Sequence, residues 1–193
     1  GVCDTLPVND KAKSKAIAIA LSTKFGMGNS AFRVGANEER YVDTVPFGCY
    51  PKSLFEDIGY YDEELVRNQD DELNARLIKK GYKIVLLPDL VIDYFARDKI
   101  SKVWKMFYQY GLYKPLVNKK LKGAATIRQF VPLLFVVGLI LGLILSIFIK
   151  NFYIIYLIGI LLYLALDFIA SIKIYNISNN SFCIWMGIYS WYI

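Results

Sequence analysis

The distribution of apolar residues divides the chain into two parts. Before Phe130, apolar and charged positions alternate over short distances, whereas Phe130–Ile149 is a run of twenty positions without a charged residue. A helix of about 20 apolar residues is long enough to cross the hydrocarbon core of a bilayer. A second apolar run contains one charged residue, and a third begins near Ser181. The pattern predicts membrane helices at about 130–149, 152–172 and 182–193, the last one truncated.

Shorter patterns predict an α/β arrangement for the part before these helices. Stretches rich in β-branched and aromatic residues indicate strands, and apolar residues at helical spacing indicate helices. The expected elements are helices over 11–25, 53–58, 68–80 and 99–113 and strands over 41–45, 82–87 and 90–94. Gly59 and Gly81 are expected to end the helices before them. Residues 25–30 contain two glycines but lack the Gly-Lys-Ser/Thr ending of a phosphate-binding loop, which favours a plain turn.

Three consecutive acids, Asp70, Asp71 and Glu72, lie where the helix over 68–80 is expected to begin. Asn68 can cap this helix, with Asp71 as the returning acid of a capping box. Acids in a first turn stabilise the helix dipole by about 0.3–1 kcal/mol each, which would explain the cluster without any function. Three adjacent acids also repel one another, and Asp70 at the loop–helix junction is best placed to point outward. The expected apolar face comprises Leu73, Leu77 and Ile78.

The helix over 99–113 is expected to be basic and amphipathic. Its apolar positions recur at helical spacing, and its lysines lie elsewhere on the helical wheel; the apolar residues are Ile100, Val103, Trp104 and Phe107. A basic, aromatic-rich helix beside a membrane span is typical of a helix that lies in the membrane interface. A helix that packs on the core of the N-terminal part is the alternative.

Charge and composition narrow the function classes. The net charge is +6, and Lys114, Lys119, Lys120 and Lys122 precede the first apolar run. This placement favours a cytoplasmic segment facing anionic lipid over a nucleic-acid groove. The sequence contains no histidine, which excludes imidazole bases and His-ligated zinc within these residues, so proton transfer here would depend on carboxylates, lysine or tyrosine. The three cysteines have no C-x-x-C spacing and are expected to be unpaired.

Several phrases of the sequence together carry a family resemblance. The segment from Gly48 to Asp89 contains Phe-Glu-Asp-Ile-Gly-Tyr-Tyr-Asp-Glu-Glu-Leu, an acidic motif, Leu-x-x-Arg and Gly-Tyr-Lys-Ile. This segment resembles the acceptor half of family 2 glycosyltransferases. The phrases Phe-Gly-x-Gly-Asn-Ser-x-Phe-Arg, Val-Asp-Thr-Val and Arg-Asn-Gln-Asp-Asp-Glu-Leu-Asn, with Gln109-Tyr110-Gly111 and Lys114, resemble more narrowly the succinoglycan-biosynthesis type of membrane glycosyltransferase.

The resemblance implies a GT-A fold, a nucleotide-sugar donor, a divalent cation (Mg or Mn) and inversion at the anomeric carbon. In the family a Glu-Asp pair supplies the general base. The matching positions are Gln69-Asp70, so the resemblance assigns the general base to Asp70, with Asp71 beside it. Gly48, Glu72, Arg97 and Gln109 are assigned to substrate binding, Arg97 toward the donor diphosphate. An ion pair with Asp98 or Asp93 is the alternative for Arg97, and a helix-face amide the alternative for Gln109.

The sequence also departs from the family pattern. Tyr94 stands at about the place where members often carry a histidine near the metal, so no metal ligand is assigned. The donor half with its Asp-x-Asp motif is not found among these residues, and we expect the chain to be a piece of a longer protein that is inactive alone. The expected organisation is a partial catalytic domain over 1–98, an interface helix and juxtamembrane segment over 99–129, and a membrane region over 130–193.

Two functions remain open at this point. The first is an inverting glycosyltransferase with a lipid-linked or polysaccharide acceptor, acting at the cytoplasmic face of the inner (plasma) membrane in cell-surface polysaccharide synthesis. The second is a non-catalytic, membrane-anchored assembly subunit of a polysaccharide synthase. A transporter that uses Asp167 as its ion site is disfavoured, because two and a half spans form no closed pathway.

Overall fold

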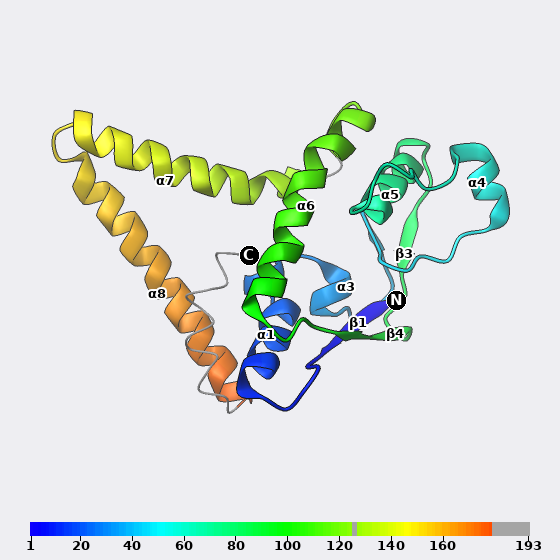
Figure 1. Ribbon diagram of the computed structural model, residues 1–193, viewed down its shortest axis with the longest axis horizontal. Helices are drawn as coiled ribbons and strands as arrows, with labels where there is room; N and C mark the ends of the chain where they lie inside the picture. The colour runs from blue at the N-terminus through cyan, green and yellow to red at the C-terminus, as the bar shows by residue number, and fades with distance from the viewer. Residues whose placement is uncertain (125–126, 179–193) are drawn as a thin grey trace.

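The computed structural model describes residues 1–124 and 127–178 and is an α/β chain extended by two apolar helices (Figure 1). In chain order its elements are β1 (Val2–Leu6), α1 (Ala12–Ser22), α2 (Lys24–Met27), α3 (Ala31–Val34), β2 (Arg40–Val42), α4 (Lys52–Ile58), α5 (Gln69–Lys79), β3 (Ile84–Leu86), β4 (Val91–Phe95), α6 (Ile100–Lys120), the 3-10 helix η1 (Ile127–Phe130), α7 (Val131–Phe148) and α8 (Phe152–Ser178). The mixed α/β class expected from the sequence is confirmed.

The strands form two small sheets of two strands each. β1 pairs with β4 in parallel, with Val2 opposite Val91 and Leu6 opposite Phe95. β2 pairs with β3 in the antiparallel sense. The sequence did not predict β1, because a parallel partner lies far away along the chain and leaves no local hairpin signal. The strands expected over 41–45 and 82–87 are shorter than predicted, at three residues each.

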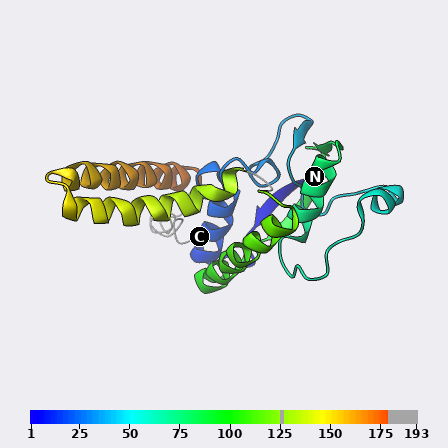
Figure 2. The same ribbon diagram turned by 90° about the horizontal axis from the view of Figure 1, so that it is seen from above.

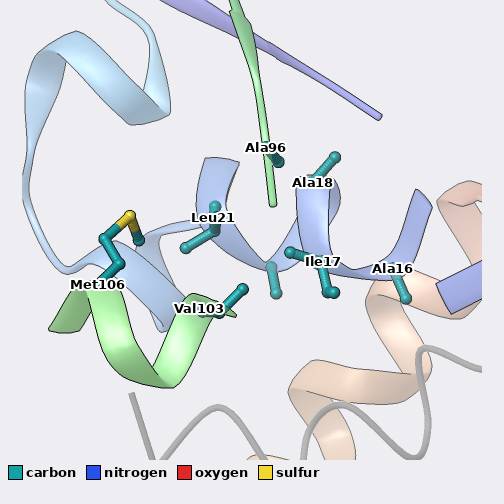
Figure 3. Close-up of a cluster of buried hydrophobic side chains, with 8 residues drawn as sticks. Ala16, Ile17, Ala18, Leu21, Ala96, Val103 and Met106 are labelled. Carbon is teal, nitrogen blue, oxygen red and sulfur yellow. The ribbon is translucent and has the colours of Figure 1, made fainter. Parts of the chain in front are cut away.

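The main hydrophobic core lies between α1 and α6. Ile17 and Leu21 of α1 are buried against Val103 and Met106 of α6, and Ala96 after β4 closes the cluster (Figure 3). The small residues of α1 allow this close approach, because an alanine side chain adds little bulk between the two backbones. Helix α6 is thereby fixed to the N-terminal part of the chain.

Helix α6 has two apolar faces. Val103, Met106 and Val117 are buried, whereas the exposed row at spacing i, i+4, i+8 consists of Trp104, Tyr108 and Leu112. The prediction that Trp104 shares one face with Val103 was wrong: Trp104 is 52% exposed and stacks on Tyr108 at 5.3 Å. The inner face is that of a core helix, and contact of the outer row with a membrane stays a prediction. Pro115 lies inside the helix one residue after Lys114.

Helix α5 forms where the acidic cluster predicted it, but its start differs from the prediction. Asn68 adopts the left-handed conformation with φ of 63°, and its side chain makes no cap. The Asn68 amide instead donates to the Tyr110 carbonyl on α6 at 3.0 Å. The expected capping box with Asp71 was therefore wrong. Gly81, with φ of 93°, follows the end of α5 as expected.

The apolar face of α5 is narrower than expected. Leu73 and Leu77 are buried, as predicted, while Ile78 is 42% exposed. The helix over 53–58 is confirmed as α4, which Gly59 ends with φ of 81°. Gly59 has a positive φ, a region that L-residues with a Cβ rarely occupy.

The loop expected over 25–30 is shorter than predicted. Residues 24–27 form the helical turn α2, which Thr23 caps by accepting the Gly26 N–H at 3.2 Å. A Cβ on Gly26 would lie 2.1 Å from the Ala20 carbonyl oxygen, so only glycine fits this return of the chain. Two glycines here serve a tight turn between α1 and α3, which agrees with the favoured interpretation over a phosphate loop.

Helices α7 and α8 are each long and apolar enough to cross a membrane, over Val131–Phe148 and Phe152–Ile172. They form a hairpin joined at Lys150–Asn151, contact each other, and diverge away from the turn in the view of Figure 1, while they overlap in that of Figure 2. Tyr156 lies against Gly142, where a Cβ would come within 2.6 Å of its ring, and its hydroxyl donates to the Leu139 carbonyl at 3.1 Å. The spans predicted over 130–149 and 152–172 match these helices, while the one over 182–193 lies outside the described residues.

Candidate functional site

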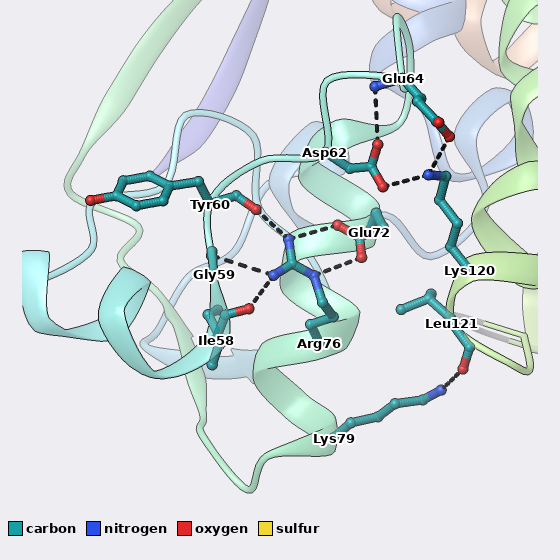
Figure 4. Close-up of polar contacts among 10 residues, drawn as sticks. All are labelled: Ile58, Gly59, Tyr60, Asp62, Glu64, Glu72, Arg76, Lys79, Lys120 and Leu121. Atoms are coloured by element: carbon teal, nitrogen blue, oxygen red, sulfur yellow. Dashed lines mark hydrogen bonds and ion pairs between the residues drawn. The ribbon is translucent and has the colours of Figure 1, made fainter.

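The three acids at the start of α5 have three different environments. Glu72 is 4% exposed, and Arg76 holds both of its carboxylate oxygens, at 2.6 and 2.9 Å (Figure 4). The same guanidinium donates to the carbonyls of Gly59 and Tyr60, at 3.3 and 2.7 Å, and to that of Ile58. Glu72 and Arg76 thus fasten the loop after α4 to α5.

Asp71 joins α5 to two other parts of the chain. Its Oδ1 accepts a hydrogen bond from the Thr44 hydroxyl at 3.1 Å, and its Oδ2 pairs with Lys114 of α6. The side chains of Lys114 and Asp71 are 28% and 24% exposed, so the pair is only partly screened by water. Asp71 is therefore occupied on both oxygens.

Asp70 is the acid with spare hydrogen-bonding capacity among the contacts that the structure describes. It is half-buried, and its Oδ1 accepts the Asp71 N–H at 3.0 Å. Burial raises the pKa of the Asp70 carboxyl, the charge of Asp71 raises it further, and Lys114 acts in the opposite direction. A carboxylate whose pKa is raised in this way is a stronger proton acceptor than a free one.

Three tyrosines lie close enough to Asp70 to feel its charge. Burial raises the pKa of Tyr50 to about 12, and Tyr61 and Asp70 add to the effect. Burial is also the largest cause of the raised pKa of Tyr61 and of Tyr110, with Asp70 as a further contributor to both. The surroundings of Asp70 are thus made of aromatic rings that carry hydroxyl groups, from the loop before α4, the loop before α5, and α6.

A chain of hydrogen bonds links Tyr50 to Asp71 and fixes the position of the Tyr50 ring. The Tyr50 hydroxyl donates to Asn74 at 2.7 Å, and the Asn74 amide donates to the Thr44 hydroxyl at 2.9 Å and to the Val45 carbonyl at 3.1 Å. Thr44 in turn donates to Asp71. Asn74 is fully buried, so its partners are fixed and the position of Tyr50 is well determined.

The predicted substrate residues fall at different distances from this cluster. Gly48 lies against Tyr50, since a Cβ there would be 2.2 Å from the Tyr50 hydroxyl oxygen. Gln109 accepts a hydrogen bond from Arg67 Nε at 3.1 Å, which brings it to the loop before α5. Arg97 is exposed after β4 and forms no ion pair within the described residues, because Asp98 pairs with Lys102 at 2.8 Å. None of the hydrogen bonds and ion pairs among the described residues joins Arg97 to Asp70.

Sequence reasoning did not assign a role to Arg33, which adds a cation to this region. Its guanidinium lies 4.2 Å from the centre of the Tyr94 ring, and one of its nitrogens is buried without a hydrogen-bond partner among the described residues. Its charge lowers the pKa of Tyr110, which burial and Tyr94 raise. The signal for Arg33 was present in the Phe-Gly-x-Gly-Asn-Ser-x-Phe-Arg phrase, and that for Lys114 in the phrase with Gln109.

The residues that the structure describes do not form a metal site by themselves. Across residues 1–124 and 127–178, no group of three or more Cys, Asp or Glu side chains is placed to hold a metal ion. Tyr94, at the place where the family carries a histidine, is covered by the Arg33 guanidinium, a group that repels a cation. The divalent cation stays an expectation, and no step below depends on it.

Comparisons with known proteins agree with the resemblance seen in the motifs. The chain is 30% identical over 114 residues, 58% of its length, to a dolichyl N-acetyl-α-D-glucosaminyl phosphate 3-β-D-2,3-diacetamido-2,3-dideoxy-β-D-glucuronosyltransferase of Methanococcus voltae. It is 30% identical over 119 residues, 62% of its length, to the succinoglycan biosynthesis protein ExoA of Rhizobium meliloti (strain 1021).

These matches have a limited extent. They cover 35% and 36% of the two relatives, so the chain spans about a third of their length. No family model matches the chain, and no solved structure matches it. Within these bounds, the comparisons confirm the predicted resemblance to membrane glycosyltransferases of the succinoglycan-biosynthesis type.

Proposed function

We propose that this chain is part of an inverting glycosyltransferase of GT-A fold that moves a sugar from a nucleotide-sugar donor to a lipid-linked or polysaccharide acceptor. Asp70 is the general base. The observation that carries the proposal is the environment of Asp70: it is half-buried, has a raised pKa, and keeps an oxygen unengaged by the described residues, while Asp71 and Glu72 are fully occupied. The names of the two relatives support the general class of reaction.

The chemistry follows from this position. An acceptor hydroxyl that hydrogen-bonds to Asp70 gives up its proton to the carboxylate as its oxygen bonds to the anomeric carbon. The bond from that carbon to the donor diphosphate breaks on the opposite face, so the configuration inverts. Tyr50, Tyr61 and Tyr110 supply ring faces and hydroxyls for a sugar near Asp70.

Cations nearby suit the departing diphosphate. Arg33 has a buried nitrogen without a described partner, and Arg67 extends from the loop that precedes α5. Guanidinium groups match phosphate oxygens in charge and geometry. In this proposal Arg33 and Arg67 bind the donor phosphates, and Gln109 orients Arg67 by accepting its Nε hydrogen bond.

The apolar helices suit a lipid-linked acceptor. α7 and α8 continue the chain after the basic end of α6, and the exposed row of Trp104, Tyr108 and Leu112 lies on α6 itself. We place the protein in the plasma membrane as a multi-pass protein with its catalytic part in the cytoplasm, in agreement with the positive residues before the first span. The product belongs to cell-surface polysaccharide synthesis.

The decisive test is Asp70→Asn in membranes that contain the full-length protein. Removing a general base lowers turnover by about 10²–10⁴-fold while leaving membrane insertion unchanged. Asp89→Asn is the matched control, since Asp89 is an exposed aspartate outside the cluster. Transfer of labelled sugar to lipid extract measures turnover. Turnover of Asp70→Asn equal to that of Asp89→Asn would remove Asp70 from the mechanism and favour the assembly-subunit alternative.

A further inference from the structure

A second polar region lies at the opposite end of α6 from Lys114. A pocket of about 420 Å³ opens between the start of α1 and the start of α6. Its lining includes Lys11, Lys13 and Lys99, and none of these lysines forms an ion pair with a described residue. The lining therefore carries a positive charge that the described part of the chain leaves largely uncompensated.

Two helix N-termini meet at this pocket. Lys11 precedes α1 and Lys99 precedes α6, and neither side chain caps its helix. Neither helix has an acid in its first turn. The N-terminus of a helix carries a partial positive charge and N–H groups without helical partners, which together attract anions. Two such ends beside three lysines form a stronger anion site than either end alone.

A buried side chain supplies independent evidence of a ligand. Ser14 lines the pocket and is 1% exposed, yet its hydroxyl has no hydrogen-bond partner among the described residues. A buried hydroxyl without a partner costs free energy, so such groups are usually satisfied by a ligand or water. Ser14 is on the face of α1 that packs toward α6, because it precedes the buried Ile17 and Leu21 at helical spacing.

The acids near the pocket do not cancel this charge. Asp98 lines the pocket, but its carboxylate pairs with Lys102 at 2.8 Å, and Lys99 contributes only weakly to its lowered pKa. Asp10 pairs with Lys15 at 3.1 Å. Asn9 accepts the Lys11 N–H at 3.1 Å and so orders the chain before α1.

We propose that this pocket binds a phosphate group, separately from the sugar-transfer site. Phosphate oxygens match both the lysine ammonium groups and the N–H groups of the two helix ends. Two sources share this chemistry: a free phosphate compound and the head group of a lipid. The last turns of α8 lie beside the start of α1 in Figures 1, 2 and 3, and α8 is long and apolar enough to cross a membrane.

The test uses the full chain in phosphatidylcholine nanodiscs. Inorganic phosphate should raise the melting temperature above the value in chloride of equal ionic strength. If the bound phosphate group belongs to a lipid, nanodiscs that also contain phosphatidic acid should give a raised melting temperature before inorganic phosphate is added. Added phosphate should then raise it little further. A free source predicts the same phosphate effect in both discs. No phosphate-specific increase in either disc would overturn the site.

Three variants localise the effect. Lys13→Glu combined with Lys99→Glu should weaken phosphate binding by about tenfold or more, the scale of one lost charge-assisted contact. Lys105→Glu makes the same change on α6 outside the pocket and should leave binding as in the parent. Ser14→Ala should weaken binding without lowering stability in chloride. Equal phosphate binding by the double variant and Lys105→Glu, or unchanged binding by Ser14→Ala, would contradict the proposed geometry.

Discussion

The sequence places opposite charges at the N-terminus of α5 and at the N-termini of α1 and α6. The first turn of α5 contains three acids, whereas the first turns of α1 and α6 contain none and a lysine precedes each. Every helix start attracts negative charge. Where the chain supplies that charge itself, Arg76, Lys114 and Thr44 bind two of the three carboxylates, and Asp70 keeps an oxygen without a partner among the described residues. Where the chain supplies no acid, as in the first turns of α1 and α6, the positive end of the helix is available to an external anion.

The largest expected effect comes from a substitution that removes the partner of a buried acid at the N-terminus of α5. Arg76→Met leaves Glu72 buried without its partner and also frees three carbonyls of the loop over 58–60. Loss of one member of a buried ion pair costs about 3–5 kcal/mol, and we expect about 2–4 here because Arg76 is a quarter exposed. Urea unfolding followed by circular dichroism measures the change. Arg40→Met on the exposed strand β2 is the control, and equal stability of the two variants would refute this role.

An effect of opposite sign is expected at Asp70. Its pKa is higher in the folded chain than in the unfolded chain, so deprotonation destabilises the fold. This penalty is absent below the unfolded pKa and complete above the folded pKa. Asp70→Asn should therefore raise the free energy of unfolding at neutral pH by about 0.5–2 kcal/mol, the usual range of single stabilising substitutions.

The stability gain of Asp70→Asn should disappear as the pH falls through the folded pKa, which denaturant titrations at several pH values can measure. Turnover of the parent should decline over the same window as the base becomes protonated. A gain that is independent of pH would show that the charge of Asp70 is not its cause.

The smallest expected effect adds an acid where the sequence has none. Ser101→Asp places a carboxylate in the first turn of α6 and should stabilise the chain by about 0.3–1 kcal/mol, since it meets the helix dipole. The same substitution should remove the response to phosphate, because the added charge occupies the site. Thermal melts with and without phosphate measure both. Ser53→Asp on α4 is the control, and a retained phosphate response in Ser101→Asp would separate the helix end from the pocket.

Local patterns predicted α4, α5 and the first part of α6, because each has a periodic apolar face or a glycine stop, although α6 continues beyond residue 113 to Lys120. The two apolar helices were predicted from long runs with few or no charged residues. They missed β1, which pairs among the described residues with a strand remote in sequence. They placed Trp104 on the wrong face, because a helix with two apolar rows gives no single direction of burial. The capping assignment of Asn68 failed because Tyr110 on α6 offers its side chain a tertiary partner.

The candidate site was predictable only in part for the same reason. The acidic cluster and its family phrase singled out Asp70. The pairing of Lys114 with Asp71 and the chain from Tyr50 through Asn74 to Thr44 join residues that are distant along the sequence. Which of three adjacent acids remains open to a substrate depends on such tertiary contacts.

The length of α6 determines how far its two ends influence each other. At 1.5 Å per residue, Lys99 and Lys114 are about 22 Å apart along the axis. The Debye length at physiological salt is about 8 Å, so the electrostatic effect of a charge introduced at one end of α6 is largely screened at the other end. Free-energy changes from Asp70→Asn and from the double lysine variant should consequently be additive. The protein can change its phosphate affinity without altering the proton affinity of its carboxylate.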